Sequence, residues 1–112
     1  MPDDLVPPAE FRILLALVDG PKHGHAIRLD VRERTEGRVD MGPGTLYGAI
    51  KRLDRRGWIE EVEANGGAGD ADGRKRTYRL TREGRQAARS EVARLEELLG
   101  IARDKALRPA GG

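Results

Sequence analysis

The stretch Met41–Glu63, MGPGTLYGAIKRLDRRGWIEEVE, carries the most informative pattern in the chain. Four apolar side chains recur in it at positions i, i+3, i+4 and i+7: Leu46, Ala49, Ile50 and Leu53. This spacing predicts an amphipathic helix that starts near Pro43, a residue suited to a first helical turn, and ends at Gly57. The opposite face of that helix carries Thr45, Gly48, Lys51, Arg52 and Arg55. One face is therefore apolar and the other cationic.

Two shorter helices are predicted before this one. Four apolar residues after Pro7-Pro8 repeat the same spacing: Phe11, Leu14, Leu15 and Val18. They predict a helix that Gly20-Pro21 ends. A second helix is indicated by Ile27 and Val31, which lie one turn apart, and is closed by Gly37.

The residues after Gly57 favour two strands. Trp58–Glu63 indicates a short strand with imperfect alternation, and Arg76–Leu80 alternates with Tyr78 and Leu80 on the core face. The stretch 64–74 between them is rich in glycine and aspartate, so we predict a mobile loop. The predicted fold class is mainly α with a small β-hairpin, an α+β arrangement.

The longest periodic segment runs from residue 82 to residue 107, after Thr81 as a plausible N-cap. Its apolar residues step by four and three, which is a heptad pattern: Ala88, Val92, Leu95, Leu99, Ala102 and Ala106. Such a helix would be roughly 39 Å long and would project beyond a small domain. We therefore predict that Val92, Leu95, Leu99 and Ala102 form a dimer contact. The alternative is that this seam covers the core of its own chain.

At 112 residues, the chain has the size of one domain, which we divide into a body at 1–81, a dimerisation helix at 82–107 and a disordered tail at 108–112. The sequence contains no cysteine, which excludes disulfides and thiolate metal sites. It has no apolar run long enough to cross a membrane, and its acidic start is unlike a signal peptide. These features predict a cytoplasmic protein.

Charge is unevenly distributed along the chain. The formal net charge is only +2, yet residues 43–57 and residues 64–86 each sum to +3, while residues 1–20 and 58–63 each sum to −3. The positive charge thus gathers on the third predicted helix and on the hairpin. A helix with a basic outer face suits the major groove of DNA, and its slim front at Gly44 and Gly48 would allow close approach.

We accordingly predict that the residues that contact DNA are Thr45, Tyr47, Gly48, Lys51 and Arg52 on the helix, with Arg74, Lys75 and Arg76 on the hairpin. Each cluster has a simpler interpretation. The helix face could be merely solvated, and the hairpin cations could protect an edge strand from pairing. For Tyr47, two interpretations are possible: its hydroxyl contacts a phosphate, or the side chain packs against the body.

The residues offer little for catalysis or metal binding. His23 and His25 stand at a loop-to-helix junction without a spaced cluster of other ligands, and Glu60, Glu61 and Glu63 lack a nucleophile and an orienting base. No glycine-rich phosphate loop followed by Lys-Ser or Lys-Thr is present. We therefore predict no enzyme activity, no metal and no cofactor.

Several stretches of the chain form a recognisable set: Pro8-Ala-Glu-Phe-Arg-Ile-Leu-Leu-Ala-Leu17, Asp19-Gly-Pro-Lys-His-Gly24, Gly42-Pro-Gly-Thr-Leu-Tyr47, Leu53, Gly57-Trp-Ile59 and Arg74-Lys-Arg-Thr-Tyr-Arg-Leu-Thr-Arg-Glu-Gly-Arg85. Together they resemble the PadR family of bacterial transcriptional regulators, and the resemblance extends from about residue 5 to residue 103. With one C-terminal helix, the chain is similar to the short PadR subgroup.

The resemblance implies a winged helix-turn-helix domain, a C-terminal helix that dimerises and repression relieved by a small molecule. Of the residues of the third helix, it places Thr45, Tyr47, Lys51 and Arg52 on DNA. On the hairpin, or wing, it places Arg74, Lys75 and Arg76. Two departures stand out. His25 occupies a position where the family usually has a tyrosine, and the helix at 82–107 has no aromatic residue with which to stack a flat ligand.

Our leading hypothesis is a homodimeric repressor that reads a pseudo-palindromic operator in double-stranded DNA. An unknown small-molecule effector could release it, and its pocket would lie where the two long helices meet the winged domains. The alternative hypothesis is a winged-helix adaptor that binds protein and not DNA, because the acidic strand at 58–63 lies next to the third helix.

Overall fold

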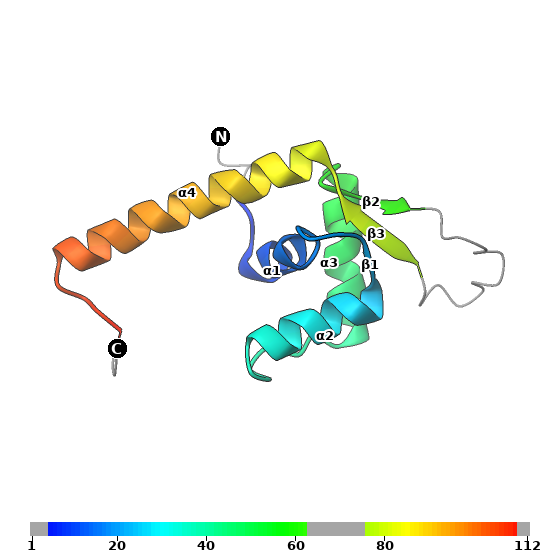
Figure 1. Cartoon of the computed structure of the whole chain (residues 1–112), viewed down its shortest axis with the longest axis horizontal. Helices are drawn as coiled ribbons and strands as arrows, with labels where there is room; N and C mark the ends of the chain where they lie inside the picture. The colour runs from blue at the N-terminus through cyan, green and yellow to red at the C-terminus, as the bar shows by residue number, and fades with distance from the viewer. Residues whose placement is uncertain (1–4, 63–75, 110–112) are drawn as a thin grey trace.

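The computed structural model describes residues 5–62 and 76–109. In these residues, four helices and a three-stranded sheet follow the chain in this order: α1 (Pro8–Ala16), β1 (Lys22–His23), α2 (Gly24–Arg34), α3 (Pro43–Arg55), β2 (Ile59–Val62), β3 (Thr77–Leu80) and α4 (Arg82–Asp104). Figure 1 shows α1, α2 and α3 gathered beside the sheet, with α4 extending away from them. The predicted class, mostly helical with a small antiparallel sheet, is confirmed.

The core lies between the first three helices and the sheet. Its largest fully buried side chains come from every one of these layers: Ile13, Leu14, Leu17, Ile27, Leu46, Leu53 and Ile59. All four residues of the predicted apolar face of α3 are buried. That helix has the most strongly amphipathic sequence of the three, so its local pattern determines which face turns inward.

The sequence predicts the wrong buried face for α1. Leu15 and Val18 are exposed, and the helix instead buries Glu10, Ile13, Leu14 and Ala16 before it ends. Residues 13–18 are all apolar, so the sequence offers two overlapping stripes and tertiary packing selects between them. One consequence is that a carboxylate, Glu10, enters the core.

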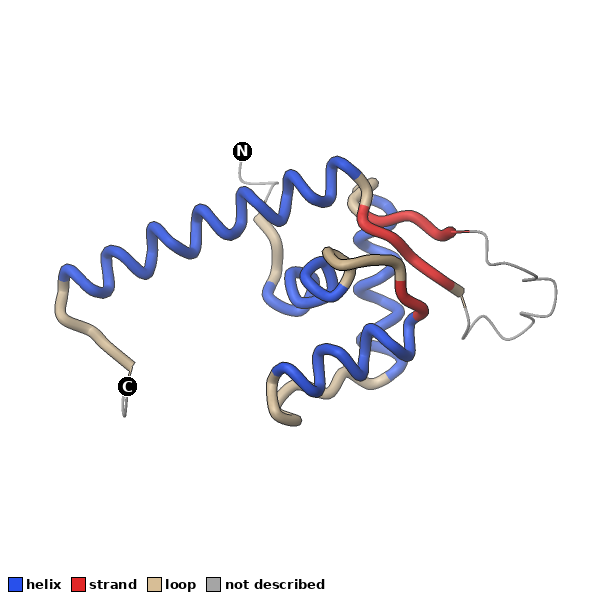
Figure 2. The backbone as a smooth tube through the Cα atoms, viewed as in Figure 1, coloured by secondary structure: helices blue, strands red, loops and turns tan. Residues whose placement is uncertain are grey.

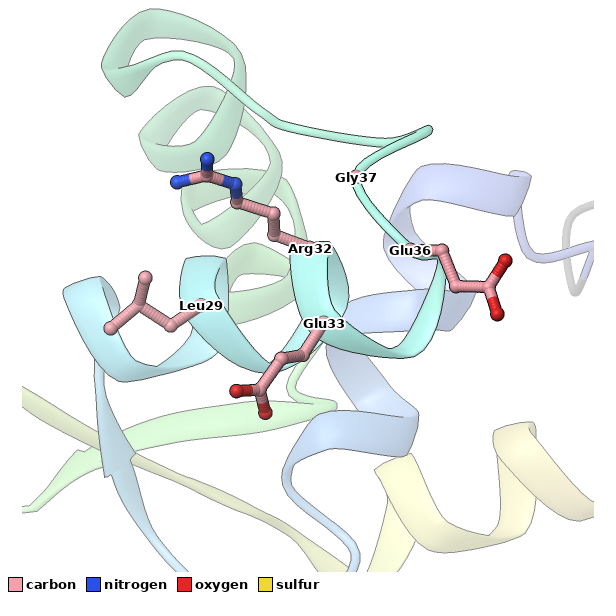
Figure 3. Close-up of a pocket in the computed structure, with 5 residues that line it drawn as sticks. All are labelled: Leu29, Arg32, Glu33, Glu36 and Gly37. Atoms are coloured by element: carbon pink, nitrogen blue, oxygen red, sulfur yellow. The ribbon is translucent and has the colours of Figure 1, made fainter.

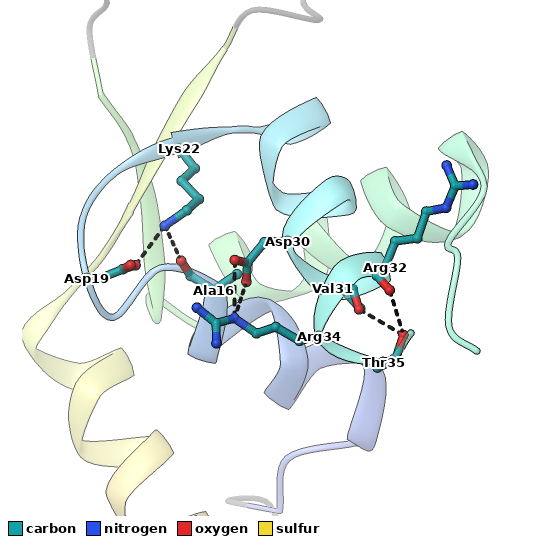
Figure 4. A network of polar contacts seen from close by, with 8 residues as sticks. All are labelled: Ala16, Asp19, Lys22, Asp30, Val31, Arg32, Arg34 and Thr35. Carbon is teal, nitrogen blue, oxygen red and sulfur yellow. Dashed lines mark hydrogen bonds and ion pairs between the residues drawn. The ribbon is translucent and has the colours of Figure 1, made fainter. Parts of the chain in front are cut away.

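Side-chain contacts fix the connection from α1 to α2 (Figure 4). Lys22 Nζ donates to the carbonyl oxygen of Ala16 at 2.6 Å and to Asp19 Oδ1 at 2.7 Å. At the far end of α2, the Thr35 hydroxyl donates to the carbonyl oxygen of Val31 at 2.9 Å and ties off the last turn. Lys22 therefore holds the link between α1 and α2, and Thr35 holds the end of α2 from which the chain leads on to α3.

The sheet has the order β1-β3-β2 and is antiparallel throughout (Figure 2). Ile59 pairs with Leu80 and Val62 pairs with Thr77, which is the hairpin that the sequence predicts. Tyr78 is buried as predicted, and burial raises the pKa of its hydroxyl. The short strand β1 was not predicted, because two residues are too few to show alternation. The predicted mobile loop at 64–74 lies outside the described residues.

The first turn of α4 is locked onto the start of β2. Thr81 caps the helix by accepting from the Gly84 N–H at 2.9 Å, and its hydroxyl donates to the Gly57 carbonyl at 2.6 Å. A Cβ on Gly84 would overlap the Trp58 carbonyl oxygen, so only glycine allows this close approach. The helix ends at Asp104, three residues before the predicted end, and Ala106 has a positive φ of 60°.

Candidate nucleic-acid interface

The outer face of α3 presents the predicted DNA-contacting residues on one side of the helix. Thr45, Lys51, Arg52 and Arg55 are exposed, and Gly48 is half-buried among them. At the start of the helix, a Cβ on Gly42 or Gly44 would meet open space. The front of α3 is thus slim and flanked by cations, which is the shape and charge that a DNA groove accepts.

Tyr47 flanks this face and packs against α2. Its ring lies on Gly24, where an added Cβ would come within 2.9 Å of Tyr47 Cε1. The ring is half-buried against the core. It therefore packs against the body, which is one of the two interpretations of Tyr47 that the sequence left open. Its hydroxyl lies at the start of α2, against Gly24, whose neighbours in the chain are the exposed His23 and His25.

Arg52 does not extend freely into solvent. Its Nε donates to Glu10 Oε2 at 2.9 Å, and the Glu10 side chain is only 4% exposed. Sequence reasoning missed this partner, since the two residues are 42 positions apart and belong to different helices. The only local signal is that Glu10 precedes the buried Ile13 and Leu14 by one helical turn.

On the wing, cations of β3 face carboxylates of β2. Arg76 Nε lies 3.8 Å from Glu61 Oε2, and Arg79 pairs with Glu60. All four side chains are partly exposed, so these pairs add little to stability. They do offset the negative charge of β2. Arg74 and Lys75, the other two predicted wing contacts, lie outside the described residues.

A bidentate ion pair anchors the segment that leads into α3. Arg28 donates from Nε to Asp40 Oδ1 at 2.7 Å and from Nη2 to Oδ2 at 3.2 Å. These hydrogen bonds hold the pKa of the Asp40 carboxyl below its usual range. The pair connects α2 to the turn before α3, which fixes where the front of α3 lies relative to α2.

The heptad pattern of the sequence divides into a buried part and an exposed part along α4. Ala88 is buried against the body, whereas Val92, Leu95 and Leu99 are 40–43% exposed and Ala102 is half-buried. Leu98 and Ile101, which the heptad pattern does not include, are also exposed. The boundary between the two parts is Glu91, a buried carboxylate whose pKa is lowered by hydrogen bonds from Arg94.

No converging set of polar groups suggests a cofactor or metal site in the described residues. A hollow of about 460 Å³ at the end of α2 is lined by Leu29, Arg32, Glu33, Glu36 and Gly37. Figure 3 shows its charged side chains splayed apart rather than aimed at one point. Within 5–62 and 76–109, no three His, Asp or Glu side chains are grouped to hold a metal, and no helix is long and apolar enough to span a membrane.

Three helices followed by a β-hairpin, with an amphipathic third helix, define a winged helix-turn-helix fold. Comparison with known families agrees: the transcriptional regulator PadR-like family matches residues 13–90, and the chain belongs to this family. Its members are transcriptional regulators and not enzymes, so the prediction of a non-enzymatic regulator is confirmed.

Individual proteins are also similar to the chain in sequence or in structure. The chain is 35% identical over 92 residues to an uncharacterized 37.1 kDa protein in transposon TN4556 of Streptomyces fradiae, and it spans about a quarter, 24%, of that protein's length. It is similar in structure to a PadR family transcription regulator from Clostridium difficile R20291, with a TM-score of 0.72, 24% identity and coverage of 87% of this chain and 96% of the other. Bacillus subtilis PadR in complex with operator DNA matches with a TM-score of 0.62, 23% identity and coverage of 75% and 46%.

Proposed function

We propose that this regulator is a homodimeric repressor that binds a pseudo-palindromic operator in double-stranded DNA. The observation that carries the proposal is the division of α3, whose apolar face is fully packed while its outer face is exposed and cationic. The operator complex of Bacillus subtilis PadR, a protein of the same fold, supports DNA as the partner.

In this proposal, α3 enters the major groove and the wing lies beside it. Thr45, Lys51 and Arg52 reach base edges or phosphates, while Gly48 lets the helix backbone come close. The Tyr47 hydroxyl contacts a phosphate from the edge of the helix. Arg76 contacts the backbone from the wing, together with Arg74 and Lys75.

The second part of the proposal is a dimer formed through α4. Val92, Leu95, Leu99 and Ala102 provide a heptad seam whose large side chains are exposed in the single chain. A two-fold axis between two such helices would place the recognition helices about one or two DNA turns apart, roughly 10 or 20 base pairs. A small-molecule effector that releases the repressor would bind where the paired helices meet the winged domains.

The adaptor alternative rests on the acidic strand β2. In the structure, Arg79 and Arg76 pair with Glu60 and Glu61 across the hairpin, so that strand offers little unpaired acidity to a protein partner. We therefore favour DNA as the ligand of this surface.

Lys51 provides the direct test, since it is exposed at the centre of the outer face of α3. We expect Lys51→Ala to weaken binding to the chain's own promoter by about 10- to 100-fold, measured by gel shift, with the dimer intact. Lys105→Ala removes the same charge beyond the end of α4 and is the matched control. Equal affinity of the two variants would contradict the assignment of α3 as the recognition helix.

A further inference from the structure

The pairing of Arg52 with Glu10 has a feature that stability alone does not explain. Glu10 Oε2 accepts from Arg52 Nε at 2.9 Å, but the other carboxylate oxygen, Oε1, is buried and has no hydrogen-bond partner among the described residues. A buried and half-satisfied carboxylate destabilises a fold relative to an apolar side chain of similar size. The other buried residues of α1, Ile13, Leu14 and Ala16, are all apolar, so Glu10 is the one charged residue that this helix buries.

The contact does determine where the guanidinium of Arg52 lies. The group runs back along α3, so that Nη1 is 3.6 Å from the position that a Cβ on Gly48 would occupy. Only Nε is used by Glu10, and the Arg52 side chain remains 55% exposed. The two terminal nitrogens, Nη1 and Nη2, therefore stay available as a pair of donors on the outer face of α3.

We propose that Glu10 is a positioning residue: it fixes the rotamer of Arg52 so that Nη1 and Nη2 are presented together, end-on, to a pair of acceptors on DNA. This inference rests on the proposed DNA-binding function. The acceptors are either the O6 and N7 atoms of guanine or two phosphate oxygens, both of which suit the planar guanidinium. Fixing the side chain before binding reduces the entropy that is lost when the complex forms.

The test compares Glu10→Leu with the wild-type chain on a duplex that the wild type has selected from a random pool. Removing a negative charge should by itself raise affinity for DNA. If Glu10 positions Arg52, affinity instead falls by about 3- to 10-fold, the range for immobilising one long side chain. Glu33→Gln removes the same charge from an exposed site on α2 and should stay within about twofold of the wild type.

Two further readouts separate positioning from a structural role. Thermal unfolding of Glu10→Leu should occur at the wild-type temperature or above it, because the variant loses a half-satisfied buried charge. In an Arg52→Gln background, Glu10→Leu should change DNA affinity by less than about twofold, since its effect passes through Arg52. If Glu10→Leu proves unstable, Glu10→Met, which also lacks an acceptor for Arg52 Nε, replaces it in both measurements.

The two acceptor types give different signatures. For guanine, substitution by 7-deazaguanine at one position in each half-site weakens the wild type but not Arg52→Gln. For phosphate, Arg52→Gln lowers the slope of log affinity against log salt by about one for each phosphate that the side chain no longer neutralises.

Equal or higher affinity of Glu10→Leu would overturn the inference, as would an equal loss in the absence of Arg52. If the wild type selects no duplex at all, the proposed function fails instead. In that case, NMR relaxation of the Arg52 Nε–H group still tests whether Glu10 positions Arg52. If it does, this group is rigid in the wild type and mobile in Glu10→Leu.

Discussion

The body of the molecule and the outer part of α4 use the same kinds of apolar residue in opposite ways. In the winged domain, here α1 to β3, Ile13, Ile27 and Leu53 are 0% exposed. Beyond Glu91 on α4, leucines of the same size are 40–48% exposed. The first region completes its core within one chain, and the second leaves its apolar side chains exposed, which supports the proposal that they form a dimer contact.

The transition between the two regions occurs within a single continuous helix. Gly84, Ala88 and Glu91 face the body along the first turns of α4, and Val92, Leu95 and Leu99 continue the helical spacing outward. The periodic pattern is therefore one feature of the sequence that serves two surfaces. Its inner end belongs to the core of the chain, and we propose that its outer end belongs to the dimer.

The largest expected effect comes from breaking the self-contained region. Leu53→Ala removes a fully buried side chain of α3 and should lower the free energy of unfolding by about 2–5 kcal/mol. Urea unfolding followed by circular dichroism measures this change. Leu29→Ala, at a leucine of α2 that is 44% exposed, is the control and should change it by less than about 0.5 kcal/mol. Similar losses in both variants would remove the contrast between buried and exposed leucines.

A smaller effect on folding, but a large one on assembly, is expected on the outer part of α4. Leu99→Glu should weaken the dimer by about 100-fold or more, because two charges would be buried near the two-fold axis, while the winged domain stays folded. Sedimentation equilibrium measures the dimer constant. Leu29→Glu places the same charge at a leucine of nearly equal exposure and should leave the dimer unchanged. A dimer disrupted by the α2 variant alone would move the interface away from α4.

The smallest effect concerns the boundary itself. Hydrogen bonds from Arg94 keep the pKa of Glu91 below its usual value of 4.5, so the pair stabilises the fold above that pH and the contribution disappears as the pH falls through the lowered pKa. Arg94→Gln should raise the pKa of Glu91 and make the fold more sensitive to mild acid. Carboxyl NMR titration reports the shift directly, and an unchanged pKa would show that Arg94 is not its cause.

The sequence predicts most of the fold because most of its helices have clear local patterns. The stripe of α3 and the start of α4 at Thr81 follow from spacing and capping alone. The inner face of α1 could not be predicted, because six consecutive apolar residues permit more than one stripe. The Glu10–Arg52 pair could not be predicted either, because it joins two helices through tertiary packing and has no local signature.

We propose that the basic outer face of α3 and the wing bind DNA as part of a dimer. The most direct test is the affinity of the wild-type chain for its own promoter, measured by fluorescence anisotropy as salt is raised from about 50 mM to about 200 mM. Phosphate neutralisation releases counterions, so for about 6–10 phosphate contacts the affinity should fall by about 10³- to 10⁵-fold. Binding that is absent, or that is independent of salt, would contradict DNA binding by this surface.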